Sequence, residues 1–169
     1  MSSTYLDIQS VNYLINAIEP DSLEGPVQSA WANILGKGGF FDEDCYAIET
    51  NRRRETQYPD VIVIRIIEFM TGPAPVDILM VECKRPRRNA TVWHFDELAN
   101  AQLDCQLTET PNSSGFVFGA AEIGRQVRFY EKFDGQEPVP LHNGVYDILT
   151  DAEDVEWWLN YMKQTGPRR

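Results

Sequence analysis

The chain has 169 residues, 43% of them hydrophobic, and a formal net charge of −11 at pH 7. This length and apolar content are enough for one domain with its own core, without disulfide or metal staples. No run of residues approaches transmembrane length, and the N-terminus lacks the basic start and apolar stretch of a signal peptide. The composition therefore predicts a soluble intracellular protein, cytoplasmic or nuclear, and argues against a membrane protein.

Two helices are predicted before the first strand. Apolar residues recur at helical spacing between residues 8 and 18, and Pro20 ends this stretch. A second helix is predicted from Ser22 or Pro26 to Leu35, because proline is tolerated in a first turn. Three glycines in the next four residues are expected to stop it.

A strand at about 46–50 is predicted to precede a β-hairpin. The hairpin consists of two apolar runs, 61–67 and 76–81, and the glycine and prolines of 71–75 indicate the turn between them. This long apolar hairpin is the strongest strand signal in the chain, so it is expected to lie at the centre of a sheet.

The second half of the chain adds helix, two strands and helix. A helix is predicted from about 91 to 108, strands at 116–120 and 126–133, and a last helix that begins with a capping box at Thr150–Glu153 and ends near Lys163. The order αα-βββ-α-ββ-α predicts a single α/β domain, a sandwich with a mixed central sheet of about five strands flanked by helices.

Three charged residues lie at the ends of the hairpin. The predicted turn pairs residues whose numbers sum to about 143, so Asp60 should face Cys83 and lie beside Glu82. Lys84 is two residues from Glu82 on one strand, so both side chains should point to the same face. The hairpin therefore predicts that two carboxylates and a lysine converge at one end of an apolar element.

This convergence suits phosphodiester hydrolysis. Asp60 and Glu82 would repel each other unless a cation lay between them, which favours Mg²⁺ or Mn²⁺ as a cofactor. The backbone carbonyl of Cys83 is a further oxygen ligand of the kind these cations prefer. A metal there would activate a water molecule, and Lys84 would orient that water or stabilise the charge developing on the phosphate.

The motifs Pro59-Asp60 and Glu82-Cys83-Lys84, joined by a hairpin, resemble the signature of the PD-(D/E)XK nuclease superfamily. The order of elements is also similar to small predicted nuclease-like domains common in fungal genomes, and the resemblance covers about residues 22–132. It implies a restriction-endonuclease-like fold in which the aspartate and the glutamate bind divalent metal and the lysine serves the water. A simpler reading is that the triplet is a strand end emerging into solvent and that the aspartate belongs to a turn.

Further site residues are suggested by the same resemblance, since the superfamily often places a glutamate on the helix before the first strand and, in some branches, a glutamine on the helix after the triplet. Glu24, which shares a helical face with Gln28, is one candidate, although an acidic residue near a helix start also favours the helix dipole. Glu49, in the strand before the hairpin, is another. Gln102 is preferred to Gln106 because it lies on the face that looks more buried.

Seven of the 15 basic residues flank the predicted site, and the remainder carries 8 basic against 26 acidic residues, or −18. Such an uneven charge distribution would attract a phosphate backbone to one cleft and repel it from the rest of the surface, so DNA or RNA is the expected partner. The alternative is that these residues are solvated loops. Cutting both strands of a duplex would usually require two active sites, so a homodimer is a candidate assembly. The flanking residues are Arg52, Arg53, Arg54, Lys84, Arg85, Arg87 and Arg88.

Other features point away from nucleic acid. Trp157 and Trp158 have the ring surfaces that single-strand binders use for stacking, but acidic residues surround them, which favours core packing or a protein interface. The acidic composition likewise supports an alternative function, a catalytically inactive domain of the same fold that binds or regulates proteins. Cys45, Cys83 and Cys105 have no metal-like spacing and are expected to be reduced core thiols.

Overall fold

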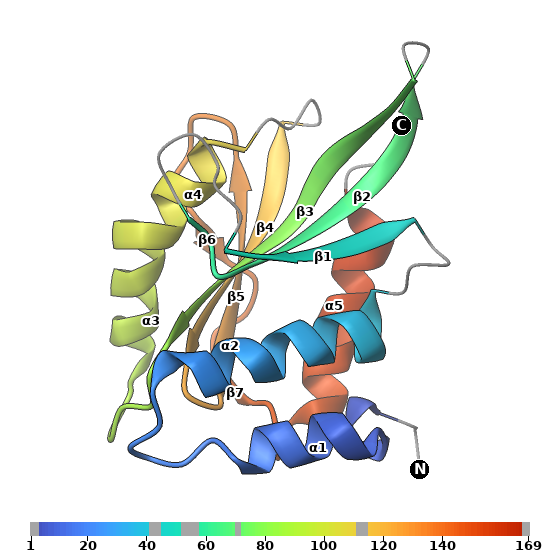
Figure 1. Cartoon of the computed structure of the whole chain (residues 1–169). Coiled ribbons are helices and arrows are strands. Elements are labelled where there is room, and N and C mark those ends of the chain that lie inside the picture. Colours follow the sequence, from blue (N-terminus) through green and yellow to red (C-terminus); the bar gives the residue numbers. More distant parts are fainter. Residues whose placement is uncertain (1–3, 41–44, 52–57, 70–71, 111–114, 167–169) are drawn as a thin grey trace.

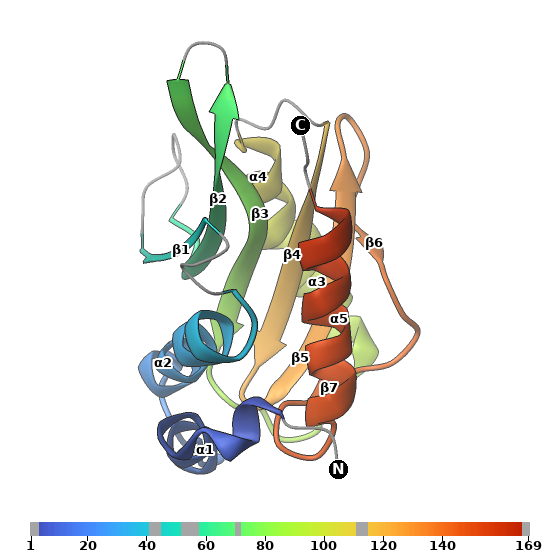
Figure 2. The same ribbon diagram turned by 90° about the vertical axis from the view of Figure 1, so that its right-hand side faces the viewer.

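A mixed β-sheet with helices on both faces forms the centre of the computed structural model, which describes residues 4–40, 45–51, 58–69, 72–110 and 115–166 (Figures 1 and 2). The strand order is β1-β2-β3-β4-β5-β6, and β7 also pairs with β5. The predicted α/β class and mixed sheet are therefore confirmed. The sheet has seven strands where about five were expected, because the chain between β5 and the last helix adds two strands of two residues each.

The helices and strands follow one another in the predicted order. The strands are β1 (Tyr46–Thr50), β2 (Val61–Phe69), β3 (Gly72–Lys84), β4 (Phe116–Ile123), β5 (Gln126–Phe133), β6 (Val139–Pro140) and β7 (Tyr146–Asp147). The helices are α1 (Gln9–Asn16), α2 (Glu24–Asn33), α3 (Val92–Leu98), α4 (Asp104–Thr108) and α5 (Ala152–Thr165). A short 3₁₀ turn, Tyr5–Asp7, precedes α1, and π-helical segments follow α2 (Ile34–Gly39) and join α3 to α4 (Ala99–Leu103).

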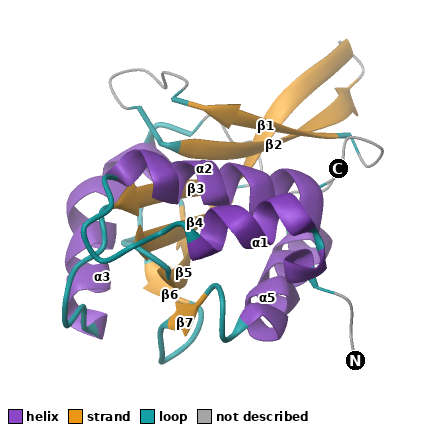
Figure 3. Ribbon diagram, turned by 60° about the horizontal axis from the view of Figure 1, so that its bottom comes forward, coloured by secondary structure: helices purple, strands orange, loops and turns teal. Residues whose placement is uncertain are grey.

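Two apolar layers hold the helices to the sheet. Figure 3 shows α1 and α2 side by side; with α5 they cover one face, where Val11, Trp31 and Leu159 are buried against alternate residues of β3 and β4. The other face is covered by α3, α4 and the π-helical segment between them, through Phe95 of α3 and Leu103 of that segment among others. Side chains alternate between the faces of a strand, so the hairpin supplies residues to both layers.

The β2–β3 hairpin pairs as predicted, with a small difference in register. Val61 lies opposite Val81, so partner numbers near the site sum to 142 rather than 143, and Asp60 is level with Glu82. An irregularity between Val63 and Ile64 shifts the register by one more residue towards the turn. The strands are also longer than expected: Gly72 to Pro75, assigned to the turn, belong to β3.

The sheet changes from antiparallel to parallel pairing beside the hairpin. β3 pairs with β4 in parallel, and α3 and α4 form the connection between them. Gly119 permits close approach of this connection, because a Cβ atom there would lie 2.7 Å from Leu103 Cδ2. The parallel register places Glu122 of β4 beside Cys83 of β3, which brings a residue far along the chain to the end of the hairpin.

Three local predictions are wrong. The π-helical segment continues through the glycines expected to stop the second helix, and the chain leaves it at Phe40. The last helix starts at Ala152 with Asp151 at its N-cap; the predicted capping box does not form, and Asp151 instead accepts a hydrogen bond from the backbone of Asp147. Among the three free cysteines only Cys83 lies in the core, whereas Cys45 and Cys105 are exposed.

None of the helices in the described part of the chain combines the length and the apolar character needed to cross a bilayer.

Candidate functional site

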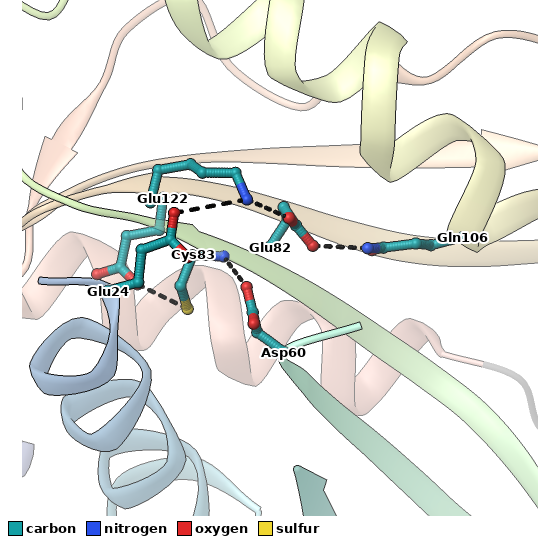
Figure 4. Close-up of polar contacts among 7 residues, drawn as sticks. Glu24, Asp60, Glu82, Cys83, Gln106 and Glu122 are labelled. Carbon is teal, nitrogen blue, oxygen red and sulfur yellow. Dashed lines mark hydrogen bonds and ion pairs between the residues drawn. The ribbon is translucent and has the colours of Figure 1, made fainter. Parts of the chain in front are cut away.

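The Asp60 carboxylate is held against the end of β3. It lies directly before β2, and its Oδ2 accepts a hydrogen bond of 2.7 Å from the backbone N–H of Cys83. The Asp60 carbonyl accepts two more, from Asn51 of the segment after β1 and from the Gln28 side chain of α2. Three elements therefore fix Asp60, so its position follows from these contacts and not from a free turn; Figure 4 shows the contact with Cys83.

Glu82 has both carboxylate oxygens bound. Lys84 Nζ lies 2.5 Å from Oε1, and Gln106 of α4 donates a hydrogen bond of 2.6 Å from Nε2 to Oε2. Glu82 is 5% exposed and Gln106 is 4% exposed, so these contacts replace water that the carboxylate has lost. Figure 4 shows the side-chain nitrogen of Gln106 pointing at the Glu82 carboxylate.

The exposed carboxylate of Glu24 is a second acidic neighbour of Lys84. Glu24 is the first residue of α2, and its Oε1 is 3.9 Å from Lys84 Nζ. A carboxylate at the start of a helix is favoured by the helix dipole, and the same position brings Glu24 to the predicted site. A structural role at the helix start and a role in the site are therefore compatible for Glu24. Asp60, Glu82, Lys84 and Glu24 thus form one cluster, called here the carboxylate–lysine cluster.

Burial and neighbouring charges both shift the pKa values of the cluster. Burial raises the pKa of Asp60 to about 6; the hydrogen bond from Cys83 opposes this rise and the charge of Glu82 adds to it. Burial alone would lower the pKa of Lys84, but its hydrogen bond to Glu82 and the surrounding negative charges outweigh burial, so the pKa is raised. Lys84 is therefore an ammonium ion at neutral pH and acts as a donor, not as a base.

The expectation that Gln102 lies on the more buried face is wrong, because Gln102 is exposed, whereas Gln106 is buried and contacts Glu82. The cause is the π-helical segment between α3 and α4, which inserts one extra residue into the helix. Leu98 and Leu103, five residues apart, both reach the sheet, and Gln106 follows in phase with Leu103. A regular helical wheel cannot reveal this shift.

Glu122 is a buried carboxyl that the sequence interpretation missed. It is fully buried on β4. Its Oε2 accepts a hydrogen bond from the Cys83 thiol, with Sγ at 3.5 Å, and its Oε1 has no hydrogen-bond partner within the residues described. Burial raises its pKa well above the usual range. The only sequence signal was a glutamate inside an apolar run, but the predicted strand ended two residues before it. The predicted candidate Glu49 lies opposite Ile62, two residues along β2 from Asp60.

An open groove begins at Lys84. Two adjoining cavities of about 780 and 470 Å³ share Pro86, Arg87 and Arg88, and the second extends to Arg125 on the β4–β5 turn. Gly124 holds this turn in place: its φ is +65°, its N–H donates to the Lys84 carbonyl, and a Cβ atom would lie 3.0 Å from Pro86. The arginine groove is defined by Arg85, Arg87, Arg88 and Arg125.

Acidic side chains offset the positive charge of the arginine groove. Acidic side chains line the same cavities, and Arg125 Nε lies 3.5 Å from Asp147. Of the predicted nucleic-acid contacts, Arg85, Arg87 and Arg88 do line the groove, and Arg125 was missed because it lies about 40 residues further along the chain. Arg52, Arg53 and Arg54 lie outside the described residues.

The oxygen donors of Asp60 and Glu82 are of the type that Mg²⁺ or Mn²⁺ would take, but by themselves they do not complete a metal site. Within the described residues no group of three or more His, Cys, Asp or Glu side chains is placed to hold an ion. Asp60 and Glu82 supply two carboxylates, and a backbone carbonyl, water and phosphate would have to complete the shell, which is how Mg²⁺ is usually bound. Gln106 Oε1, buried and without a hydrogen-bond partner in the described part of the chain, is a further acceptor for such a water.

Comparisons of the chain with protein-family models, with curated proteins and with solved structures each find no match.

Proposed function

We propose that the chain is a divalent-metal-dependent nuclease that hydrolyses phosphodiester bonds in DNA or RNA. The observation that carries this proposal is the meeting of Asp60, Glu82 and Lys84 at one end of the hairpin, where Lys84 also lines the arginine groove. This is the arrangement expected from the resemblance to the PD-(D/E)XK superfamily, and the resemblance is the second support for the proposal.

Asp60 and Glu82 would hold the Mg²⁺ or Mn²⁺ cofactor, together with the backbone carbonyl of Cys83. Such an ion would supply Lewis acidity, which would lower the pKa of a bound water and offset negative charge on the phosphate. Gln106 holds Glu82 in one orientation through Oε2. Lys84, protonated, donates to the attacking water or to a phosphate oxygen, and it would exchange its contact with Glu82 for that one when substrate binds.

Cleavage of labelled single- and double-stranded DNA and RNA tests the proposal. Each substrate is incubated with Mg²⁺, Mn²⁺ or EDTA, with the wild type and with Lys84→Ala. We expect metal-dependent cutting of at least one substrate and a fall in rate of roughly 10²-fold or more in the variant, because one preorganised charge donor is lost. Absence of cutting of every substrate by a folded protein would contradict the proposal. Activity that survives Lys84→Ala would mean that the active site is not at Lys84.

The arginine groove should bind the phosphate backbone. We expect Arg87→Ala and Arg125→Ala each to weaken binding of a fluorescent oligonucleotide in EDTA and to reduce the slope of log Kd against log salt by about 1. Hydrolysis of bis(p-nitrophenyl) phosphate, which is too small to occupy the groove, should be unchanged. Lys37→Ala, which removes an exposed lysine hydrogen-bonded to Ser10, is the matched control. Equal salt slopes in all four proteins would show that the groove does not contact the backbone.

A second candidate is a catalytically inactive domain of the same fold that binds or regulates proteins. It is favoured by the Lys84–Glu82 contact, in which the lysine already neutralises the carboxylate, and by the balanced charge of the arginine groove. The two candidates differ in their response to metal, because only the nuclease requires a cation between Asp60 and Glu82.

A further inference from the structure

The outer face of α5 exposes an ordered pair of aromatic rings. Trp157 is 58% exposed, and its ring stacks on Tyr161 with centroids 5.8 Å apart and an interplanar angle of 9°. Trp158 meets Trp157 edge-on at 4.7 Å and is itself half-buried. Neighbouring rings therefore hold Trp157 in place although most of its surface is in solvent, so little order has to be gained when it binds a partner.

Aromatic contacts continue from α5 onto the sheet. Tyr161 packs on Phe118 at 6.1 Å, Phe118 on Phe116 at 5.5 Å, and Phe116 on Phe133 at 5.8 Å. Phe133, at the end of β5, is 43% exposed. Figure 2 shows α5 lying along β4 and β5, which places these rings on one side of the molecule. We call this surface, comprising Trp157, Tyr161, Phe116 and Phe133, the aromatic face.

Carboxylates flank the aromatic face. Glu153 and Asp154 are exposed one turn before Trp157, and Glu131 precedes Phe133 by two residues and so shares its side of β5. The single basic residue of α5, Lys163, lies towards β1, where its Nζ is 5.7 Å from the Tyr46 ring. The aromatic face therefore combines exposed rings with negative charge.

We propose that the aromatic face binds a cationic segment of a partner protein, with an arginine or lysine side chain over the Trp157 ring and its charge paired with Glu153 or Asp154. A cation over an indole face is stabilised by the ring quadrupole, and a nearby carboxylate adds a charge-assisted hydrogen bond. Tryptophan is enriched among the residues that contribute most to binding energy in protein interfaces. No residue of the carboxylate–lysine cluster or the arginine groove takes part, so this interaction does not depend on hydrolysis.

Two other occupants fit less well. A nucleic acid could stack bases on Trp157, but its phosphates would meet Glu153 and Asp154. A second copy related by a two-fold axis would present the same acidic patch, because such a contact uses one surface on both copies, and that patch offers no basic partner for Glu153 and Asp154. A cationic protein segment satisfies both the rings and the charges.

Fluorescence anisotropy with labelled dodecapeptides tests the proposal. The probe alternates arginine with serine, and a second peptide carries glutamate in place of arginine. We expect the arginine peptide alone to bind, with affinity falling as salt rises, and Trp157→Ala to weaken it about tenfold or more. Trp93→Ala is the matched control, because Trp93, on α3, has a similar exposed fraction of 62%.

The charge contribution is tested separately. Glu153→Gln combined with Asp154→Asn should weaken the arginine peptide several-fold, whereas Glu19→Gln with Asp21→Asn, which removes two exposed carboxylates near the arginine groove, should not. Failure of the arginine peptide to bind, equal binding to Trp157→Ala and wild type, or equal binding of the glutamate peptide would overturn the proposal. Concentration-dependent dimerisation that Trp157→Ala abolishes would also overturn it, by assigning the aromatic face to a second copy.

Discussion

Asp60→Asn is expected to abolish hydrolysis while leaving the fold intact. Asparagine keeps an oxygen that can accept the Cys83 N–H bond, and it removes a carboxyl whose pKa burial raises to about 6, so the folded state should lose little stability. It also removes one of the two carboxylates proposed to bind the cation. Loss of several kcal/mol of transition-state stabilisation corresponds to a fall in kcat/KM of about 10³-fold or more.

The same variant should lose the thermal response to metal. At a concentration ten times Kd, Mg²⁺ should raise the Tm of the wild type by about 3–6 °C, because binding to the folded state alone contributes about 1.4 kcal/mol. Asp60→Asn should show no rise. Asp104→Asn is the matched control, since Asp104 is also a half-buried aspartate with its own partner, Lys132, and should respond like the wild type. A wild type without any metal-dependent rise would favour the inactive, protein-binding alternative.

Glu122→Gln should change how stability depends on pH. Burial raises the pKa of Glu122 well above that of an unfolded glutamate, so the folded chain keeps a proton that the unfolded chain releases above about pH 4.3. The stabilisation is fully present below that pH and is lost as pH rises towards the folded pKa. Relative to the variant, the wild type should lose about 1.4 kcal/mol of unfolding free energy per pH unit in this window.

Urea unfolding between pH 4 and pH 8 measures this difference. Asp60 also lowers the unfolding free energy as pH rises, up to about pH 6, because its pKa is raised in the folded state. This contribution is common to both proteins and cancels in the comparison. Glu153→Gln removes an exposed carboxyl from α5 and should retain the wild-type slope. Parallel stability curves for Glu122→Gln and the wild type would mean that Glu122 ionises in the folded state, and the account of its burial would be wrong.

The residues predicted to converge were those joined by a local element. Asp60 and Glu82 are 22 residues apart, yet a hairpin places them together once its turn and strand period are known. The one-residue error in register did not separate them, because the Asp60 side chain still reaches the backbone of Cys83. Lys84 followed from the two-residue period alone.

The residues that were missed reach the site through longer-range packing. Gln106 depends on an extra residue in the helix after β3, which hydrophobic periodicity does not report. Glu122 and Arg125 depend on the parallel pairing of β4 with β3 and on the turn that Gly124 holds against Pro86. Each arrangement is set by contacts between segments far apart in the chain.

The sequence by itself determined the α/β class, the order of the elements and the hairpin that joins Asp60 to Glu82 and Lys84, because strand and helix periods and hairpin pairing are local properties. Only the tertiary structure decided which glutamine holds Glu82, that Glu122 is buried beside Cys83, and that Arg125 extends the groove. It also decided that the Trp157 ring faces solvent. These features depend on burial and on pairing between distant strands, and both arise only when the layers pack together.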